Sequence, residues 1–547
     1  SGKRKKSSKK ECYSWIDKMM GLHDTKSGKG LSVLVSSDSS PSRLDLKKML
    51  MDRFKNVSWH EFDPVSNTNE RDGLEKAFGK GVWKPQYSLE NAEVIISFDS
   101  DFLEGHPDSI NLSSGWASKR DPEKTMSRVW VLENSLTCTG MKADERIAVR
   151  KSDMHAAFLQ IAHEIESTIP LGRKVIDPAV AKSIANDFLS KSGRGVILVG
   201  ASQPSWVHQM ASVINARFRA PVSYLKTEKQ SKTISDLVSD IEQENVETLF
   251  ILGGNPAYDA PSDLQFEKAL KRVKNTLHIS MHDDETSQLC TWHLNASHPM
   301  ECWRDARSWN GTHLIGQPLI QPLYGGVSDL EILAFMSGQQ VQDGYEIVRD
   351  TFDIADGMRS QSESDRRWRT ALKNGYRENS RPMPKLVTPQ IRDIDLKLEE
   401  NNGFELCFEE SPSVGDGAFA NNGWMQEAPD PITKLTWDNA LKIAPSDAKE
   451  LSLKDGDLVK IEVNGVSLEV PVIQVPGQAK RSLSIELGYG RRFNGRICAG
   501  AGKDVYPLRS NEGMWFVKTK IGKSKGSYPL ATTQAHHPID TTGGKGT

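Results

Sequence analysis

The sequence predicts an α/β fold in which doubly wound, mainly parallel sheet lobes are followed by a C-terminal β-barrel. Through the first two-thirds of the chain, short apolar runs bounded by turns alternate with amphipathic helical patterns. This alternation with short connections indicates βαβ units and a parallel sheet. After about residue 404 the hydrophobic period becomes two, and Asn464-Gly465 is a strong hairpin signal. A chain of 547 residues can build more than one hydrophobic core.

The first set of elements begins with a strand at residues 31–37 and a helix at residues 42–54. Pro41 and the two serines before it supply the first turn and the cap of that helix. The run at residues 92–98 is apolar on both faces, which is typical of a parallel strand covered by helices on both sides. Further strands are predicted at residues 57–62 and 128–132.

A second set repeats the same alternation. Its helix at residues 204–218 carries apolar side chains at helical spacing, and its strands are short and apolar. The two sets together indicate two doubly wound lobes, or one sheet system assembled from both. The other predicted elements of this set are helices at residues 177–191, 233–244 and 262–273 and strands at residues 195–200, 248–252 and 277–281.

The predicted barrel contains two strands with alternating apolar residues on either side of Asn464-Gly465. These strands occupy residues 457–463 and 466–474, and a third occupies residues 482–487. A short helix at residues 446–451 precedes them.

The domains expected along the chain are a basic flexible lead-in (1–30), an α/β lobe (31–175), a second α/β lobe with the Gly-Gly-Asn-Pro loop (176–339), a helical insertion and linker (340–403), the barrel (404–530) and a linker toward an iron–sulfur domain (531–547).

Composition is that of an ordinary globular protein, with 37% hydrophobic and 26% charged residues. The net charge of −2 gives no indication of nucleic-acid binding, which needs a concentrated basic face. No apolar run approaches the roughly 18 residues of a membrane span.

The basic cluster at the start, which includes Lys3 and Arg4, predicts a solvated, flexible segment, with a membrane-surface or targeting role as the alternative. Because the chain begins at Ser1 without a signal-peptide pattern, we expect a missing precursor segment or a piece of a longer protein.

The cysteines do not have the spacing of a metal site. Six are present, and no two form the C-x-x-C pattern that iron–sulfur clusters and structural zinc sites use. Cys290 and Cys302 flank His293 and His298, but buried small hydrophobic residues beside unrelated histidines are the favoured interpretation. We therefore expect no metal site in this segment.

Two loops follow predicted parallel strands, where ligands bind in open sheets. The loop at Gly253, Gly254 and Asn255 has glycines that let a ligand approach the backbone, and a second loop runs from residue 200 to 204. Such loops fit a nucleotide or a pyrophosphate, although a simple turn is the alternative, since the third glycine of G-x-G-x-x-G is absent. Asp284 and Glu285 follow the next strand, as a helix N-cap or as part of the same ligand edge. No catalytic nucleophile–base pair is evident.

Several motifs occur in one order that resembles the molybdopterin oxidoreductase superfamily. That resemblance implies a cofactor site near Gly253, Gly254, Asn255, Asp284 and Glu285, and a C-terminal barrel of the double-psi type. The motifs are Leu252-Gly253-Gly254-Asn255-Pro256, Asp283-Asp284-Glu285-Thr286, the stretch from Glu301 to Arg307, Asn310-Gly311-Thr312 and Gln317-Pro318-Leu319-Ile320.

Other motifs are similar to one branch, the large iron–sulfur subunits of alternative complex III, a quinol-oxidising respiratory complex. They include Trp59-His60-Glu61-Phe62-Asp63-Pro64-Val65, Leu136-Thr137-Cys138-Thr139-Gly140 and Pro322-Leu323-Tyr324-Gly325-Gly326. This resemblance implies a cofactor-free, non-catalytic module whose iron–sulfur clusters lie in an adjoining domain. It also implies a peripheral location on the periplasmic face of the inner membrane. The implied partners are an iron–sulfur domain or subunit, multihaem and monohaem cytochrome c subunits, and integral membrane quinol-binding subunits.

The sequence departs from an active molybdenum enzyme, because no protein ligand for the metal can be placed. Asp63, Ser100 and Ser202 lie near strand ends, but ordinary loop roles explain each of them better. The sequence leaves three alternative functions open. The first is a structural module of an electron-transfer complex, the second is an active molybdopterin-dependent molybdenum or tungsten oxidoreductase, and the third is a nucleotide-binding α/β protein without redox chemistry.

Overall fold

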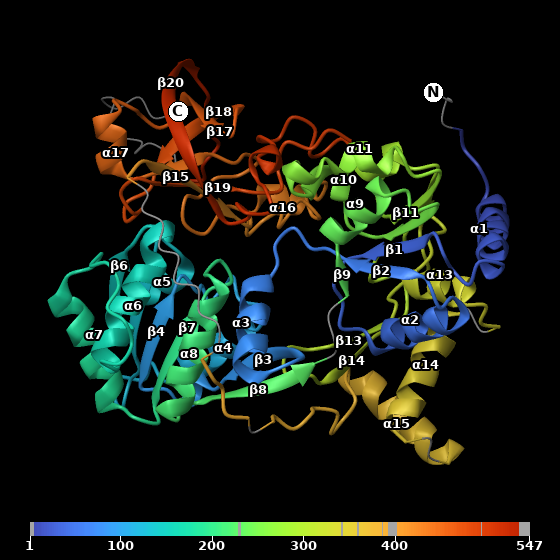
Figure 1. The fold of residues 1–547 in the computed structure, drawn as a ribbon, viewed down its shortest axis with the longest axis horizontal. Helices are drawn as coiled ribbons and strands as arrows, with labels where there is room; N and C mark the ends of the chain where they lie inside the picture. Colours follow the sequence, from blue (N-terminus) through green and yellow to red (C-terminus); the bar gives the residue numbers. More distant parts are fainter. Residues whose placement is uncertain are drawn as a thin grey trace, which may run out of the picture. The chain divides into compact units, whose positions relative to one another are not determined.

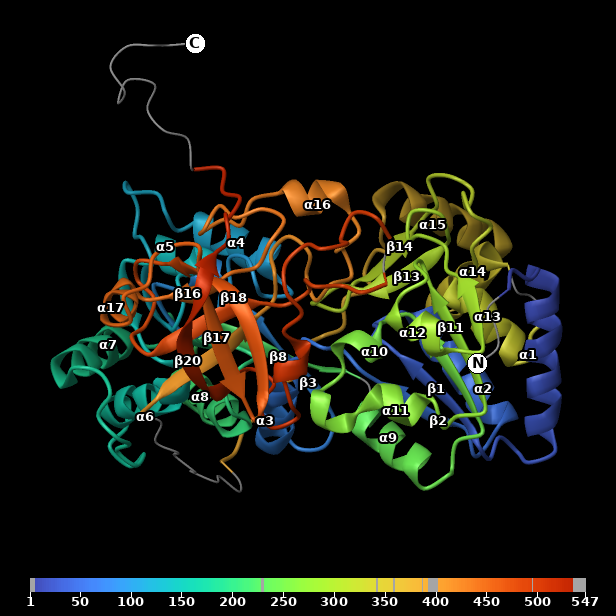
Figure 2. The same ribbon diagram turned by 90° about the horizontal axis from the view of Figure 1, so that it is seen from above.

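The computed structural model describes residues 5–227, 231–340, 343–357, 360–385, 387–391, 402–493 and 495–534. The chain forms two units (Figures 1 and 2). Unit 1 comprises Ser1–Pro64, Lys229–Met383 and Arg492–Gly495. Unit 2 comprises Val65–Glu228, Pro384–Arg491 and Arg496–Thr547.

Unit 1 is built on a parallel sheet with the strand order β12-β11-β10-β1-β2-β9. Every residue of β1 and β10 is buried, which is why both read as continuous apolar runs rather than as alternating ones. In the register of this central pair, Leu31 lies opposite Thr248 and Val35 lies opposite Leu252. The strands are β1 (Leu31–Val35), β2 (Ser58–Glu61), β9 (Lys232–Thr233), β10 (Thr248–Leu252), β11 (Asn275–Ser280) and β12 (Trp292–Asn295).

Helices cover both faces of this sheet. Val33 and Phe250 face a core that includes α2, α13 and α14, whereas Leu34 and Ile251 face α9 and α11 (Figure 1). The alternation follows from the period of two along each strand. The helices are α2 (Pro41–Arg53), α9 (Ile234–Glu242), α10 (Pro256–Asp259), α11 (Phe266–Leu270), α12 (Glu285–Leu289), α13 (Asp329–Met336), α14 (Gly344–Ala355) and α15 (Gln361–Asn374), with a separate hairpin of β13 (Arg304–Arg307) and β14 (His313–Gly316).

The flexible lead-in predicted for residues 1–30 is wrong for residues 9–24, which form helix α1 (Lys9–Asp24). A capping box between Ser8 and Glu11 starts the helix, and Ile16 and Met20 pack fully into the unit 1 core. The lysines hid this pattern because they occupy the solvent-facing side of an amphipathic helix. Lys3 and Arg4 lie outside the described residues.

Unit 2 contains a second parallel sheet with the order β6-β5-β4-β7. One face packs on α6, α7 and α8, and the other face includes Ile95, Val131 and Leu198 with Leu112 of α4. The elements are β4 (Val94–Phe98), β5 (Arg128–Glu133), β6 (Glu145–Ala148), β7 (Gly195–Val199), α3 (Thr68–Phe78), α4 (Ser109–Ala117), α5 (Cys138–Lys142), η2 (Lys151–Asp153), α6 (Met154–Ile165), α7 (Pro178–Ser190) and α8 (Ser205–Arg217), with an antiparallel pair of β3 (Val82–Tyr87) and β8 (Val222–Thr227).

Each sheet draws strands from both predicted sets, so the units divide the chain differently from lobes separated at residue 175. β7 belongs to the second set but pairs with β4, while β1 pairs with β10 over 200 residues later. The structure combines features of the two predicted arrangements: the sheets are separate, as in two lobes, but each is assembled from strands of both sets. The helix predicted at residues 262–273 is also divided, into a 3-10 turn at Ser262–Leu264 and α11.

The predicted C-terminal barrel is confirmed as a closed barrel with the order β15-β19-β16-β18-β17-β20 (Figure 2). Its hairpin turn has φ angles of 48° at Asn464 and 81° at Gly465, so both residues adopt the left-handed conformation that this turn requires. No described helix is both long and apolar enough to cross a membrane. The barrel strands are β15 (Phe404–Glu409), β16 (Leu441–Ile443), β17 (Asp457–Val463), β18 (Val466–Gln474), β19 (Ser482–Glu486) and β20 (Phe516–Ser527), with helix α17 (Pro445–Glu450) between β16 and β17.

Candidate functional site

The strand order gives each unit one point where ligands are expected. In unit 1, β2 lies on one side of β1 and β10 lies on the other side. The chain continues from β1 to β2, whereas from β10 it continues in the opposite direction, to β11 and β12. Loops that diverge in this way open a crevice at the carboxyl ends of the strands. A Cβ atom added to Gly254 would lie 3.4 Å from Ser36 Oγ, so the loops after β10 and β1 are neighbours. The site predicted at Gly253 and Gly254 therefore lies at this switch point.

The structure brings the loop of Gly253, Gly254 and Asn255 together with the Asp284-Glu285 segment through their own polar groups. Asn255 Nδ2 donates to Glu285 Oε2 at 2.8 Å, and Asn255 Oδ1 accepts from the backbone N–H of Thr286 at 3.0 Å. Glu285 Oε1 also accepts the backbone N–H of Arg492 at 2.7 Å, within the short segment that belongs to unit 1. Asn255 and Glu285 thus act as a link between loops.

Asp284 is also held within the protein. Its Oδ1 accepts the Ser287 N–H at 3.0 Å, which caps α12, and its Oδ2 accepts the Ser280 hydroxyl at 2.9 Å. Burial alone would raise the pKa of Asp284, but the hydrogen bond and charge of His278 and these donors lower it to about 2. His278 Nε2 in turn lies 3.0 Å from Gly254 O and so fixes the glycine loop. The helix-cap alternative for Asp284 matches these contacts.

We expect Asp284→Asn to lower the free energy of unfolding by about 2 kcal/mol at neutral pH. Because the folded pKa is lowered, this stability is present above about pH 4 and is lost as the pH falls toward 2. Urea unfolding of both proteins from pH 3 to pH 7 measures the difference. Asp283→Asn is the matched control, since the neighbouring Asp283 side chain is 51% exposed. An Asp284→Asn effect that did not shrink with acid would contradict the linkage.

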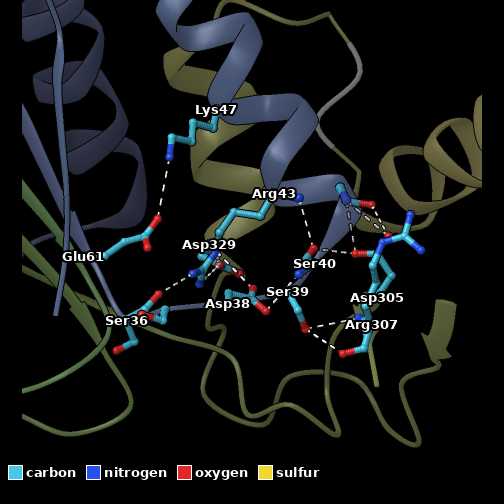
Figure 3. A network of polar contacts seen from close by, with 12 residues as sticks. Ser36, Asp38, Ser39, Ser40, Arg43, Lys47, Glu61, Asp305, Arg307 and Asp329 are labelled. Atoms are coloured by element: carbon cyan, nitrogen blue, oxygen red, sulfur yellow. Dashed lines mark hydrogen bonds and ion pairs between the residues drawn. The ribbon is translucent and has the colours of Figure 1, made fainter. Parts of the chain in front are cut away.

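The N-terminus of α2, which follows the loop after β1, is filled by a carboxylate (Figure 3). Asp305 accepts the N–H of Ser42 at 3.2–3.3 Å, the Ser42 hydroxyl at 2.8 Å and the Ser40 hydroxyl. His313 Nε2 lies 3.0 Å from Asp305 Oδ2, and both side chains are fully buried. A helix N-terminus after a strand normally offers free N–H groups to an anion. Here Asp305 takes that position.

The loop after β1 carries a further set of ion pairs. Arg43 contacts Asp329 at 2.7 Å and Asp38 at 3.2 Å, and it donates to Ser36 O at 2.8 Å (Figure 3). Asp63, one of the residues considered as a metal ligand, instead accepts the Ser37 N–H at 3.2–3.3 Å. The backbone donors of this loop therefore bind carboxylates of the same chain.

The switch point of unit 2 lies between β4 and β7 and is closed by an ion pair. Asp99, directly after β4, lies 3.0 Å from Lys151 Nζ and accepts from Ser202 Oγ and Gln203 Nε2. Asp99 has a φ of 54°, and a Cβ on Gly200 would lie 1.7 Å from Asp99 O. This crowding explains the glycine after β7. Burial would lower the pKa of the Lys151 ammonium, but the Asp99 carboxylate reverses that effect and raises it.

The remaining candidates have structural roles. Ser100 O accepts the Ser97 hydroxyl at 2.7 Å, and Ser202 is bound to Asp99. His293 Nε2 lies 3.1 Å from Ser280 O. Over the described ranges, all six cysteines are free, and no group of three or more His, Cys, Asp or Glu side chains is arranged to hold a metal ion.

Comparison with known proteins finds a sequence relative and a structure of similar fold. No family model matches the chain. It is 29% identical over 117 residues to the thiosulfate reductase molybdopterin-containing subunit PhsA of Salmonella typhimurium, a match that spans 21% of this chain and 14% of that protein. The structure matches acetylene hydratase from Pelobacter acetylenicus with a TM-score of 0.66 and 12% identity, covering 94% of this chain and 88% of that chain. The predicted fold class is confirmed by this match.

The described edge residues do not fit the pyrophosphate of a pterin dinucleotide. Such a group binds free N–H donors at helix N-termini and needs cations to balance its charge. In unit 1 the N–H groups of Ser37 and Ser42 already bind Asp63 and Asp305. In unit 2 the Lys151 ammonium is paired with Asp99. No reaction step at these edges is therefore assigned to that cofactor.

Sequence reasoning missed Asp305, Asp99 and Lys151. Asp99 had a visible signal, because it follows a buried strand at the ligand edge. Asp305 had none, since it lies 263 residues from its partner Ser42.

Proposed function

We propose that this chain, which shares the fold of the molybdopterin oxidoreductases, is a cofactor-free structural module of a quinol-oxidising complex of the alternative complex III type. One observation carries the proposal: at each switch point, donors that could hold an anion bind carboxylates of the same chain. Asp305 fills the N-terminus of α2, and Asp99 holds Lys151. At a site closed in this way, these donors already have partners in the protein without a ligand.

In this function the module holds electron carriers of neighbouring subunits at fixed distances. Its partners are an iron–sulfur domain or subunit that carries the clusters, cytochrome c subunits and integral membrane quinol-binding subunits. The place of action is the periplasmic face of the inner membrane, where the module is peripheral. Two extensively packed units offer a rigid surface for such partners.

The second candidate is an active molybdenum or tungsten enzyme with a bound pterin. The match to PhsA, a molybdopterin-containing subunit, favours it. It requires Asp305 or Lys151 to change partners when the cofactor binds.

Metal analysis separates the two candidates. The chain is purified with the subunits that accompany it, and molybdenum, tungsten and iron are measured by mass spectrometry together with pterin fluorescence after oxidation. We expect no stoichiometric molybdenum, tungsten or pterin, and iron only in fractions that contain partner subunits. Stoichiometric molybdenum or tungsten with pterin would overturn the structural function and establish the enzyme.

A further inference from the structure

A carboxylate from the barrel is buried at the start of a lobe helix in unit 2. The 3-10 turn η2 runs directly into α6, so residues 151–165 form one helical run. Glu405 of barrel strand β15 accepts the N–H of Lys151 at 2.8 Å through Oε1 and the N–H of Ser152 at 3.1 Å through Oε2. These N–H groups are among the first donors of the run, which have no partner inside the helix.

The surroundings of this carboxylate are those of an anion site. Glu405 is 0% exposed, and Oε1 also accepts the Ser482 hydroxyl at 2.7 Å. The Arg150 guanidinium lies 3.8 Å from Oε2. The buried hydroxyl of Ser152 has no hydrogen-bond partner among the described residues. Backbone donors, a hydroxyl and a nearby cation are the groups that bind carboxylate and phosphate oxygens elsewhere.

We propose that the start of this helical run is an oxyanion-binding site for a carboxylate, which the chain fills with its own Glu405. The occupant is 253 residues away in sequence and belongs to the first barrel strand. Binding therefore docks the barrel on the lobe within unit 2. This inference goes beyond the proposed function and holds whether or not the chain carries a metal.

The other contacts between this lobe and the barrel differ in kind. Arg146 Nη1 donates to Gly477 O at 2.8 Å, and the Ala479 N–H donates to Asn134 O at 2.8 Å. The acceptors in these two contacts are backbone carbonyls, and in another contact Asn134 Nδ2 donates to the Ser484 hydroxyl at 3.1 Å. No small anion replaces either kind of acceptor in place. Glu405 alone among these contacts places a carboxylate against backbone donors, so it is the contact that a free anion can restore.

The test is chemical rescue of Glu405→Ala in the full chain. This change removes a methylene and a carboxylate, and acetate supplies groups of the same size. We expect the melting temperature to fall by about 5–10 °C, because the buried N–H groups of Lys151 and Ser152 and the Ser482 hydroxyl lose this acceptor. About 0.1 M sodium acetate should then restore at least half of the loss, by binding to the folded state. Inorganic phosphate is tested in parallel, and its rescue would extend the site to larger oxyanions.

Ser482→Ala is the matched control. It removes the hydroxyl donor to Glu405 but leaves the site filled, so acetate should give no rescue beyond its effect on the unchanged protein. If Glu405→Ala does not fold, the Glu405→Gln variant is used instead, and hydrogen exchange of its backbone amides is measured in place of rescue. The amides of Lys151 and Ser152 should then exchange at least tenfold faster than in the unchanged protein, while Gly140 at α5 is unaffected. Failure of both rescue and faster exchange would overturn the anion site and leave the metal analysis untouched.

Discussion

Substitution of Lys151 by methionine is expected to lower the free energy of unfolding by about 3–5 kcal/mol, the usual cost of removing one partner of a buried ion pair. The Asp99 carboxylate lies 3.0 Å from the ammonium, and the two side chains are only 8% and 9% exposed. Methionine fills a similar volume, so the loss comes mainly from the uncompensated charge of Asp99. Urea unfolding monitored by circular dichroism measures the change.

A double variant separates charge from packing in this prediction. Adding Asp99→Asn to Lys151→Met should recover part of the loss, because the buried charge disappears while an acceptor for Ser202 remains. Lys142→Met serves as the exposed control and should change the stability by less than about 0.5 kcal/mol. If Lys151→Met unfolded like that control, the ion pair would not be what closes the switch point of unit 2.

Local patterns predicted about half of the strands. The strand predicted at residues 248–252 is β10 with the same ends, and both hairpin strands around Asn464-Gly465 are also reproduced. These successes depend on signals within a few residues, such as burial on both faces of β10 or the positive φ of a tight turn. Such local signals placed these strands.

Pairing of distant strands could not be read in the same way. β4 is covered on both faces, so its sequence says that it is central but not that β7 is its neighbour. A doubly wound order has alternatives with equal local patterns, and only packing of complete layers selects one. The prediction for residues 9–24 failed for a related reason. Lysines dominate the composition of helix α1, whereas the structure shows that Ile16 packs inward.

The candidate site was partly predictable. The switch-point rule placed Gly253 and Asp284 near each other, because β10 and β11 are adjacent parallel strands. What fills the site was not predictable, since Asp305 and Glu405 arrive from distant hairpin and barrel strands. A carboxylate cap from another element leaves no spacing signal.

The pH dependence of unit 2 should be controlled in part by Glu70 of α3. This residue is 8% exposed, and burial raises its pKa to about 7, against weaker opposing effects of Asn67 and Lys84. The folded state therefore holds a proton that the unfolded chain releases above about pH 4.5. The favourable contribution of the protonated Glu70 to the free energy of unfolding is complete below that pH. It is lost as the pH rises through 7.

Between pH 5 and pH 8 the free energy of unfolding of the unchanged protein should fall by about 3 kcal/mol as Glu70 loses its proton. We expect Glu70→Gln to abolish this fall. The neutral amide keeps the size of the protonated carboxyl and needs no proton at alkaline pH. Unfolding free energies of the two proteins should be similar at pH 5 and diverge at pH 8, where the variant is the more stable. Glu123→Gln, at an exposed position of the same unit, should follow the unchanged protein throughout. Parallel curves for Glu70→Gln and the unchanged protein would mean that Glu70 is ionised in the folded state, with Lys84 as its compensating charge.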